Sequence, residues 1–278
     1  MNRRDRGNRP LHIDYLSLFP VNNITGNSPG APSNYFDGHI YIYPHSEIPM
    51  HPELSTCASL SLAAYQDMAG QIAHKFENRF TSTTFYWKEC EGVDYLVFKG
   101  SAEPRDILLD IFAFPPVYYL RNWVHPGFAI AHKSVQKKIL KIFKKILFNR
   151  GGNSKRLVIT GHSLGAAQAE LTHLMALQAG IDSTLVCFGK PRVFLKRPKE
   201  RFPQGSALSV CSGSDIVTRV PRFCYTVGSS NQDFLYLAND GVNYLNPDLE
   251  FVEKDFSIKD SVSDHSMELY LQRSLEVV

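Results

Sequence analysis

The segment Gly161-His162-Ser163-Leu164-Gly165 carries a serine in a pattern that can do nucleophilic chemistry. It fits G-x-S-x-G, in which the serine occupies a sharp turn between a strand and a helix, and small flanking residues let these elements approach closely. The serine hydroxyl is then held at the end of the sheet, and the next N–H group, that of Leu164, points at a developing oxyanion. A plain Gly-Ser turn gives the same five letters, but the flanking segments favour the first interpretation. We therefore expect Ser163 to be a nucleophile.

A serine nucleophile needs a base, and the base needs an acid that holds its tautomer. In folds with this type of turn the chain order is serine, acid, histidine, and of the 10 histidines His173 and His265 follow Ser163. His173 lies about 15 Å further along the predicted helix, at 1.5 Å per residue, which leaves His265 as the candidate base. Asp215 is the candidate acid, because it follows a buried strand after a short turn. A simple turn residue is the alternative for Asp215.

The other carboxylates between the serine and the histidine are weaker candidates for the acid. Asp264 is next to His265 in sequence, so its side chain is expected to point away from the imidazole. The remaining aspartates follow less convincing strands; they are Asp233, Asp240, Asp248, Asp255 and Asp260. His162, beside the nucleophile, is expected to pack or to form a hydrogen bond there, and not to transfer protons.

An oxyanion hole needs a second donor besides the Leu164 N–H, and in such folds it comes from the loop after an early central strand. Gly100-Ser101 directly follows an apolar strand, so the Ser101 N–H is the expected donor. The Ser101 hydroxyl would add another bond where a carboxylate such as Asp110 fixes its rotamer.

Strands and helices must position these residues, and the hydrophobic pattern predicts most of them. A buried strand over 157–160 and a helix over 164–179 flank the serine. Buried strands over 185–189 and 207–211 follow, and a final helix begins near His265. The remaining predicted elements are a helix from about 52 to about 76, a hairpin over 83–90 and 93–99, an amphipathic helix over 128–148 with a lysine-rich face, and β-rich pieces at 223–227, 234–237 and 249–252.

Two segments outside this framework stand out by composition. Residues 1–50 are rich in Arg, Asn, Pro and Gly, which indicates a partly ordered N-terminal arm ahead of one domain over 51–278. Residues 107–120 combine many bulky apolar side chains with prolines nearby. They are read either as core strand plus loop or as a mobile lid over an acyl-chain groove.

The overall composition excludes several classes of protein. The 278 residues are 44% hydrophobic and 21% charged, which is typical of one large globular α/β domain. A net charge of +3 is too small to favour nucleic acid as a partner. The 5 cysteines lack C-x-x-C spacing, so we expect no zinc site, and their odd number favours a reducing compartment. No apolar run follows the basic first residues, so we expect no secretory signal. No apolar run in the sequence approaches the length of about 18 residues that a transmembrane helix needs, so we expect no transmembrane segment.

Five blocks in order resemble the class 3 lipases, the fungal triacylglycerol lipase type within the α/β-hydrolases. They are Tyr95 to Ser101, His125-Pro126-Gly127-Phe128, Val158 to Ala167, Phe188 to Val193, and Asp215-Ile216-Val217 with Val220-Pro221. The resemblance covers roughly residues 55 to 273. It implies an α/β-hydrolase fold, with a mostly parallel central sheet flanked by helices and a lid segment over Glu103 to about Pro115.

The resemblance also implies the site. It gives a triad of Ser163, Asp215 and His265, an oxyanion hole at Ser101 and Leu164, and Asp110 as the carboxylate that holds the Ser101 hydroxyl. The implied activity is carboxylic ester hydrolysis on lipids at a lipid–water interface, in lipid degradation, without a metal or organic cofactor. The fungal members are secreted and disulfide-bonded, whereas the odd cysteine count and the lack of a signal in this sequence favour a cytoplasmic or other intracellular setting. Peripheral association with a membrane stays an open alternative there.

Several functions remain open within this expectation. The substrate can be an acylglycerol, a phospholipid cleaved in phospholipase A fashion, or a small soluble ester. The same acyl-enzyme can pass its acyl group to an alcohol instead of water, which makes an acyltransferase. A lipid-binding scaffold that kept the fold and lost turnover is the alternative from another class.

Overall fold

The computed structural model describes residues 53–101, 115–149, 156–195, 202–203, 205–213, 215–221, 233–238, 241–245 and 263–276. All of them lie in the unit Phe36–Val278. The predicted arm over residues 1–50, Asp110, nearly all of the predicted lid, and the β-rich pieces at 223–227 and 249–252 lie outside the described residues.

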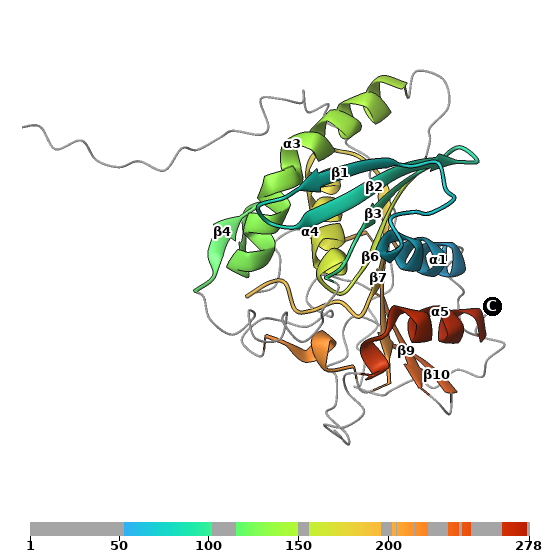
Figure 1. The fold of residues 1–278 in the computed structure, drawn as a ribbon. Helices are drawn as coiled ribbons and strands as arrows, with labels where there is room; N and C mark the ends of the chain where they lie inside the picture. The colour runs from blue at the N-terminus through green and yellow to red at the C-terminus, as the bar shows by residue number, and fades with distance from the viewer. Residues whose placement is uncertain are drawn as a thin grey trace, which may run out of the picture. The chain divides into compact units, whose positions relative to one another are not determined.

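A mixed sheet forms the centre of this unit (Figure 1), and its strand order is β1-β2-β3-β6-β7-β8-β9-β10. The strands are β1 His74–Asn78, β2 Thr83–Cys90, β3 Val93–Phe98, β6 Arg156–His162, β7 Ser183–Phe188, β8 Ala207–Ser212, β9 Asp233–Ala238 and β10 Gly241–Leu245. The five strands from β3 to β9 run parallel, and β1, β2 and β10 extend the sheet antiparallel at its two edges. The predicted α/β-hydrolase fold with a mostly parallel sheet is confirmed.

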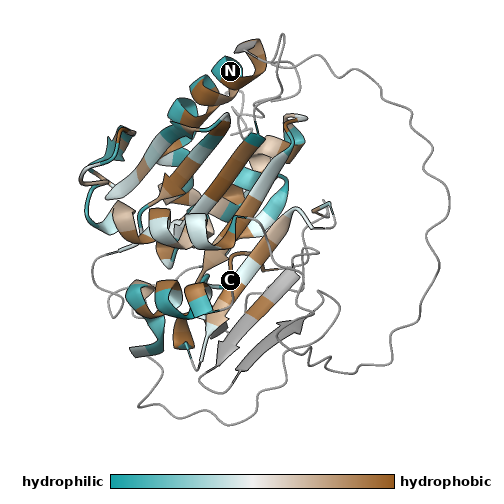
Figure 2. Ribbon diagram, turned by 90° about the vertical axis from the view of Figure 1, so that its right-hand side faces the viewer, coloured by the Kyte–Doolittle hydropathy of each residue, from teal (hydrophilic) through white to brown (hydrophobic). Residues whose placement is uncertain are grey.

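Helices cover both faces of the sheet, as parallel strands require. The helices α3 (Pro126–Asn149) and α4 (Leu164–Gln178) pack on one face, and α1 (Leu54–Tyr65) and α5 (Met267–Glu276) pack on the other (Figure 1). Figure 2 shows the matching hydropathy, with apolar residues concentrated on the central strands and alternating with polar residues along the outer helices. None of the described helices is long and apolar enough to cross a membrane.

Alternate residues of the central strands supply the two halves of the core. Leu96 and Phe98 of β3 face α3 and α4, whereas Tyr95 and Val97 face α1 and α5. This is the period of two that a strand buried on both faces shows. The apolar stripe predicted for the helix over 128–148 is likewise buried in α3: Val135, Ile139, Ile142, Phe143 and Ile146.

The first helix is shorter than its sequence indicates, and this prediction was wrong beyond Tyr65. Asp67, Met68 and Gly70 have φ angles of 51°, 57° and 74°, which no continuing α-helix allows. The Asp67 carboxylate accepts hydrogen bonds from Tyr86 and from two lysines of neighbouring elements, and these bonds hold the turn in place. The chain then forms β1, where a continuous helix to Phe76 was expected.

The end of the apolar segment after the predicted lid is a small hairpin. Strands β4 (Val117–Tyr119) and β5 (Asn122–Val124) pair antiparallel through a two-residue turn. Leu120 and Arg121 at the turn both have positive φ. Tight hairpin turns of this kind usually carry Asn-Gly, so Leu120-Arg121 is not a local signal for a hairpin.

Candidate active site

Ser163 occupies the turn between β6 and α4, and its backbone is strained there. Its φ and ψ are 58° and −128°, outside the regions that side chains with a Cβ favour. The Ser163 N–H donates to the Phe188 carbonyl oxygen of β7 at 3.0 Å, which fixes the turn to the neighbouring strand. The Ser163 side chain is fully buried.

The two glycines of the turn are needed for close packing. A Cβ on Gly161 would lie 2.6 Å from the main chain of Gly165, and a Cβ on Gly165 would collide with the Phe98 carbonyl group at the end of β3. The obstructing atoms are backbone, which cannot rotate away. The glycines therefore bring β3, β6 and α4 together around the serine.

Gly165→Ala is expected to lower the free energy of unfolding by about 1–3 kcal/mol, the usual cost of overpacking. Gly127→Ala is the matched control, because Gly127 is also the second residue of a helix but a Cβ there meets its nearest atoms at 3.3 Å. Chemical denaturation of both variants measures the difference. Equal stability of the two would show that the close approach at Gly165 has no energetic consequence.

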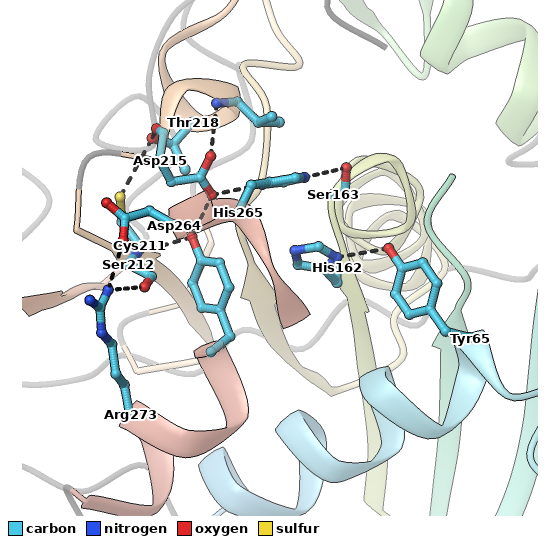
Figure 3. A network of polar contacts seen from close by, with 12 residues as sticks. Tyr65, His162, Ser163, Cys211, Ser212, Asp215, Thr218, Asp264, His265 and Arg273 are labelled. Carbon is cyan, nitrogen blue, oxygen red and sulfur yellow. Dashed lines mark hydrogen bonds and ion pairs between the residues drawn. The ribbon is translucent and has the colours of Figure 1, made fainter. Parts of the chain in front are cut away.

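The structure brings Ser163, His265 and Asp215 into one hydrogen-bonded chain (Figure 3). Ser163 Oγ lies 2.8 Å from His265 Nε2, and His265 Nδ1 lies 2.8 Å from Asp215 Oδ2. His265 and Asp215 are buried like the serine, with 1% and 0% of their side chains exposed. Both nitrogens of one imidazole are thus engaged, one by a hydroxyl and one by a carboxylate, which is the arrangement that activates a serine.

The Asp215 carboxylate is held by two further donors. The Val217 N–H donates to Oδ1 at 2.9 Å, and the Tyr270 hydroxyl of α5 donates to Oδ2 at 2.7 Å. The same Tyr270 hydroxyl accepts from the Ser212 N–H at 3.0 Å. Burial and the neighbouring Asp215 charge raise the pKa of Tyr270 well above its usual value, so its hydroxyl remains a donor.

A second residue of α5 fixes the loop that carries the base. The Arg273 guanidinium donates to the Ser212 hydroxyl at the end of β8 and to Asp264 Oδ1 at 3.4 Å. The Asp264 carboxylate therefore faces Arg273 (Figure 3), while the triad acid is Asp215, 2.8 Å from His265. The sequence did not identify Tyr270 and Arg273 as part of the site. They lie five and eight residues after His265, in a segment for which the sequence predicted only a helix.

Gly189, just after β7, makes room for the acid and the base. It has a φ of 54°, and a Cβ there would lie 2.9 Å from both Asp215 Oδ2 and the His265 ring. Gly189 lies in the block Phe188 to Val193, and the sequence alone indicated no role for it. In the structure any side chain at position 189 would push His265 away from Asp215.

Tyr270→Phe is expected to lower kcat about 3- to 10-fold at unchanged KM, because one hydrogen bond to the acid is lost. Steady-state hydrolysis of p-nitrophenyl butyrate measures it. Tyr95→Phe is the control, since the Tyr95 hydroxyl donates to Glu53 outside the site. A kcat equal to that of the wild type would contradict a role for Tyr270 in holding Asp215.

The expected oxyanion donors lie where two elements adjoin, after the end of β3 and at the start of α4. Leu164 is the first residue of α4, where helix N–H groups have no intrahelical acceptor. Ser101 is half-buried and follows β3 after Gly100, and a Cβ on Gly100 would lie 2.6 Å from the His162 carbonyl oxygen. The end of β3 therefore lies against the turn that carries the serine. Asp110, the expected partner of the Ser101 hydroxyl, lies outside the described residues.

The two other histidines near the serine in sequence have separate surroundings. His173 is buried in α4, where Nδ1 bonds the Ser183 hydroxyl at 2.8 Å, and burial lowers its pKa to about 3. His162 is buried next to the triad, and its Nδ1 lies 2.8 Å from the Tyr65 hydroxyl of α1. Burial and the adjacent His265 lower the pKa of His162 well below its usual value.

Part of the chain is similar to a known protein family. Residues 95–225 match the family model described as lipase (class 3). A search of curated proteins finds no match.

Several solved lipase structures share the fold of this chain. The triacylglyceride lipase of Rhizomucor miehei is 21% identical, with 85% of this chain and 100% of that one covered and a TM-score of 0.64. Lipase II of Rhizopus niveus is 20% identical, with 76% and 89% covered and a TM-score of 0.59. A third structure, 21% identical over 82% of this chain and 96% of that one with a TM-score of 0.63, is a triacylglycerol lipase whose catalytic centre is a serine protease triad. Residues 95–225 therefore resemble the class 3 lipases, and the chain has the fold of these lipases.

Proposed function

We propose that this chain hydrolyses acylglycerols, and that the reaction passes through an acyl-enzyme on Ser163. The observation that carries the proposal is the buried chain of hydrogen bonds from Ser163 Oγ through both nitrogens of His265 to Asp215 Oδ2. A serine, a histidine and an aspartate from the ends of three distant segments have no packing reason to align in this way. Burial excludes water and strengthens each electrostatic interaction in the chain.

In the first half of the reaction Ser163 Oγ attacks the acyl carbonyl carbon while His265 Nε2 takes the hydroxyl proton. Asp215 keeps the Nδ1 proton on the ring and stabilises the imidazolium that forms. The Leu164 and Ser101 N–H groups bind the oxyanion, and each such donor contributes about 10²–10³ in rate. The tetrahedral intermediate collapses as His265 passes the proton to the leaving alcohol.

In the second half a water molecule replaces the alcohol. His265 takes a proton from the water, whose oxygen attacks the acyl carbon on Ser163. Collapse of the second tetrahedral intermediate releases the carboxylic acid and returns the proton to Ser163. The reaction needs no group beyond the protein and water.

The class 3 lipase match and the triacylglycerol lipase fold favour an acylglycerol over other esters as the substrate. Fatty acid release from emulsified triacylglycerol, phosphatidylcholine and p-nitrophenyl butyrate tests this choice. We expect release from the triacylglycerol, with a rate that rises when the substrate forms an emulsified interface.

Each other result of that panel assigns a different activity. Fatty acid release from phosphatidylcholine alone would make the chain a phospholipase A, and cleavage of the butyrate alone would make it a soluble esterase. A new ester formed with an added acceptor alcohol would identify an acyltransferase. No turnover of any ester would leave a lipid-binding scaffold.

A further inference from the structure

We propose that Tyr65 and His162 form a positioning pair that holds the His265 ring in register with Ser163 during the reaction. The proposal rests on the proposed function, because it assigns these two residues a role in the same site. Neither residue takes part in proton transfer. They act on the reaction through His265.

The His162 ring packs against the ring of the base. Its centroid lies 4.5 Å from the His265 centroid, and the two planes are tilted by 32° (Figure 3). Tyr270 meets the His162 ring edge-on, with the centroids 5.5 Å apart. His265 is thus supported on one face by His162, in addition to its bonds to Ser163 and Asp215.

His265 needs such support because of where it lies in the chain. It is the last residue of a short 3₁₀ turn, Ser263–His265, ahead of α5. A turn of three residues places a side chain less rigidly than a strand or a helix does. A misplacement of about 1 Å at a reacting group can cost on the order of 10²-fold in rate. A ring that closes one face of His265 restricts its rotation out of the plane of the triad.

Tyr65 fixes His162 in turn. Its hydroxyl lies 2.8 Å from His162 Nδ1, and the two rings meet edge-on at 5.7 Å. Burial raises the pKa of Tyr65, and the Glu268 charge adds to the rise, so the hydroxyl keeps its proton and can donate to Nδ1. Tyr65 is the last residue of α1, and this bond connects α1 to the residue before the nucleophile.

The neighbourhood of Gly100 shows that Tyr65 is tightly placed. A Cβ on Gly100 would collide with the Tyr65 hydroxyl as well as approach the His162 carbonyl oxygen. The hydroxyl therefore lies between the end of β3, one residue before Ser101, and the turn that carries Ser163. A single side chain contacts both segments from which the expected oxyanion donors come.

The charge state of His162 suits a support for the base. Burial and the nearby His265 hold the pKa of His162 well below its usual value, so the ring is neutral in the range in which the base works. A neutral ring does not repel the imidazolium that His265 becomes in the transition state.

A double-mutant cycle tests the pair. Tyr65→Phe removes only the hydroxyl, and His162→Phe keeps an aromatic ring against His265 but removes the acceptor. We expect each single variant to lower kcat for p-nitrophenyl butyrate about 3- to 10-fold at unchanged KM. Tyr65→Phe is expected to have no further effect in the His162→Phe background, because Tyr65 acts through Nδ1.

The rate of inactivation by a fluorophosphonate is expected to fall with kcat, since both reactions need His265 in place. His162→Ala, which also removes the stacked ring, is expected to lower both rates further than His162→Phe. Tyr95→Phe is the control for loss of a buried tyrosine hydroxyl, because Tyr95 donates to Glu53, at the opposite end of α1 from Tyr65.

The outcomes separate this proposal from the proposed function. An active wild type whose Tyr65→Phe variant keeps the full kcat would overturn the pair and leave the lipase mechanism standing. Additive effects of the two single variants would overturn the claim that Tyr65 acts through His162. A wild type that neither hydrolyses esters nor reacts with the fluorophosphonate would overturn the proposed function, and the pair with it.

Discussion

Ser163→Ala is expected to lower kcat for ester hydrolysis by about 10⁶-fold without loss of the fold. The hydroxyl is the attacking group, and removal of the serine from such a triad costs on the order of 10⁶ in kcat in serine hydrolases. Release of p-nitrophenol from p-nitrophenyl butyrate by the wild type and the variant measures the ratio. Ser163 contacts the Phe188 carbonyl group through its main chain only, so alanine keeps that bond.

Ser183→Ala is a closely matched control for this prediction. Ser183 is a buried serine whose hydroxyl lies 2.8 Å from the Nδ1 of a buried histidine, His173. The other nitrogen of His173 makes no hydrogen bond within the described part of the chain, so no carboxylate completes that pair there. We expect Ser183→Ala to keep the wild-type kcat. A Ser163→Ala variant as active as the Ser183→Ala variant would show that the nucleophile is a different group.

Asp215→Asn is expected to lower kcat by about 10⁴-fold at nearly unchanged geometry. An amide in place of the carboxylate can donate to His265 Nδ1, which stabilises the wrong tautomer and removes the charge that balances the imidazolium. The side chain keeps its size, so the packing of Tyr270 and Val217 is retained. The loss is measured as kcat on the same ester, with circular dichroism and thermal unfolding to compare the folds.

Asp94→Asn controls for the loss of a buried carboxylate elsewhere. Asp94 is 2% exposed and accepts a hydrogen bond from Trp87 Nε1 near the start of β3. An asparagine there can still accept that bond, and we expect kcat to be unchanged. An Asp215→Asn variant with the same kcat as Asp94→Asn would mean that His265 works without this acid.

The turn at Ser163 was predictable because its signals are local. Strand, glycine, serine, glycine and helix follow one another within the span from Arg156 to Gln178, and both flanking elements form as expected. The central strands were predictable for a related reason, since burial on both faces produces continuous apolar runs. Chain order together with the reach of a helix then singled out His265, which the structure places beside Ser163.

The supporting residues were not predictable because their partners are distant in the chain. Tyr65 bonds a residue 97 positions later, and Tyr270 bonds one 55 positions earlier. Each tyrosine lies in a helix whose apolar pattern accounts for it as a core residue, so the sequence contains no sign of the hydroxyl's partner. The role of Gly189 was not predictable for the same reason. A side chain at this position would collide with Asp215 and His265, which are both distant from it in the chain.

The helix predicted over 52–76 is too long, again because contacts with other elements decide the structure there. Residues 66–70 are good enough helix formers that nothing local forbids continuation up to Gly70. The turn there is held from outside, because Asp67 accepts bonds from Tyr86, Lys75 and Lys99. Tertiary contacts therefore decide where α1 ends, and with it the position of Tyr65.

Covalent labelling of the full chain with a fluorophosphonate, followed by peptide mapping, tests most directly that Ser163 is the activated nucleophile. We predict one adduct per chain, on the peptide that contains Ser163, and none on Ser163→Ala. An intact wild type that takes up no label, or that carries it on a serine other than Ser163, would contradict the assignment of the catalytic centre.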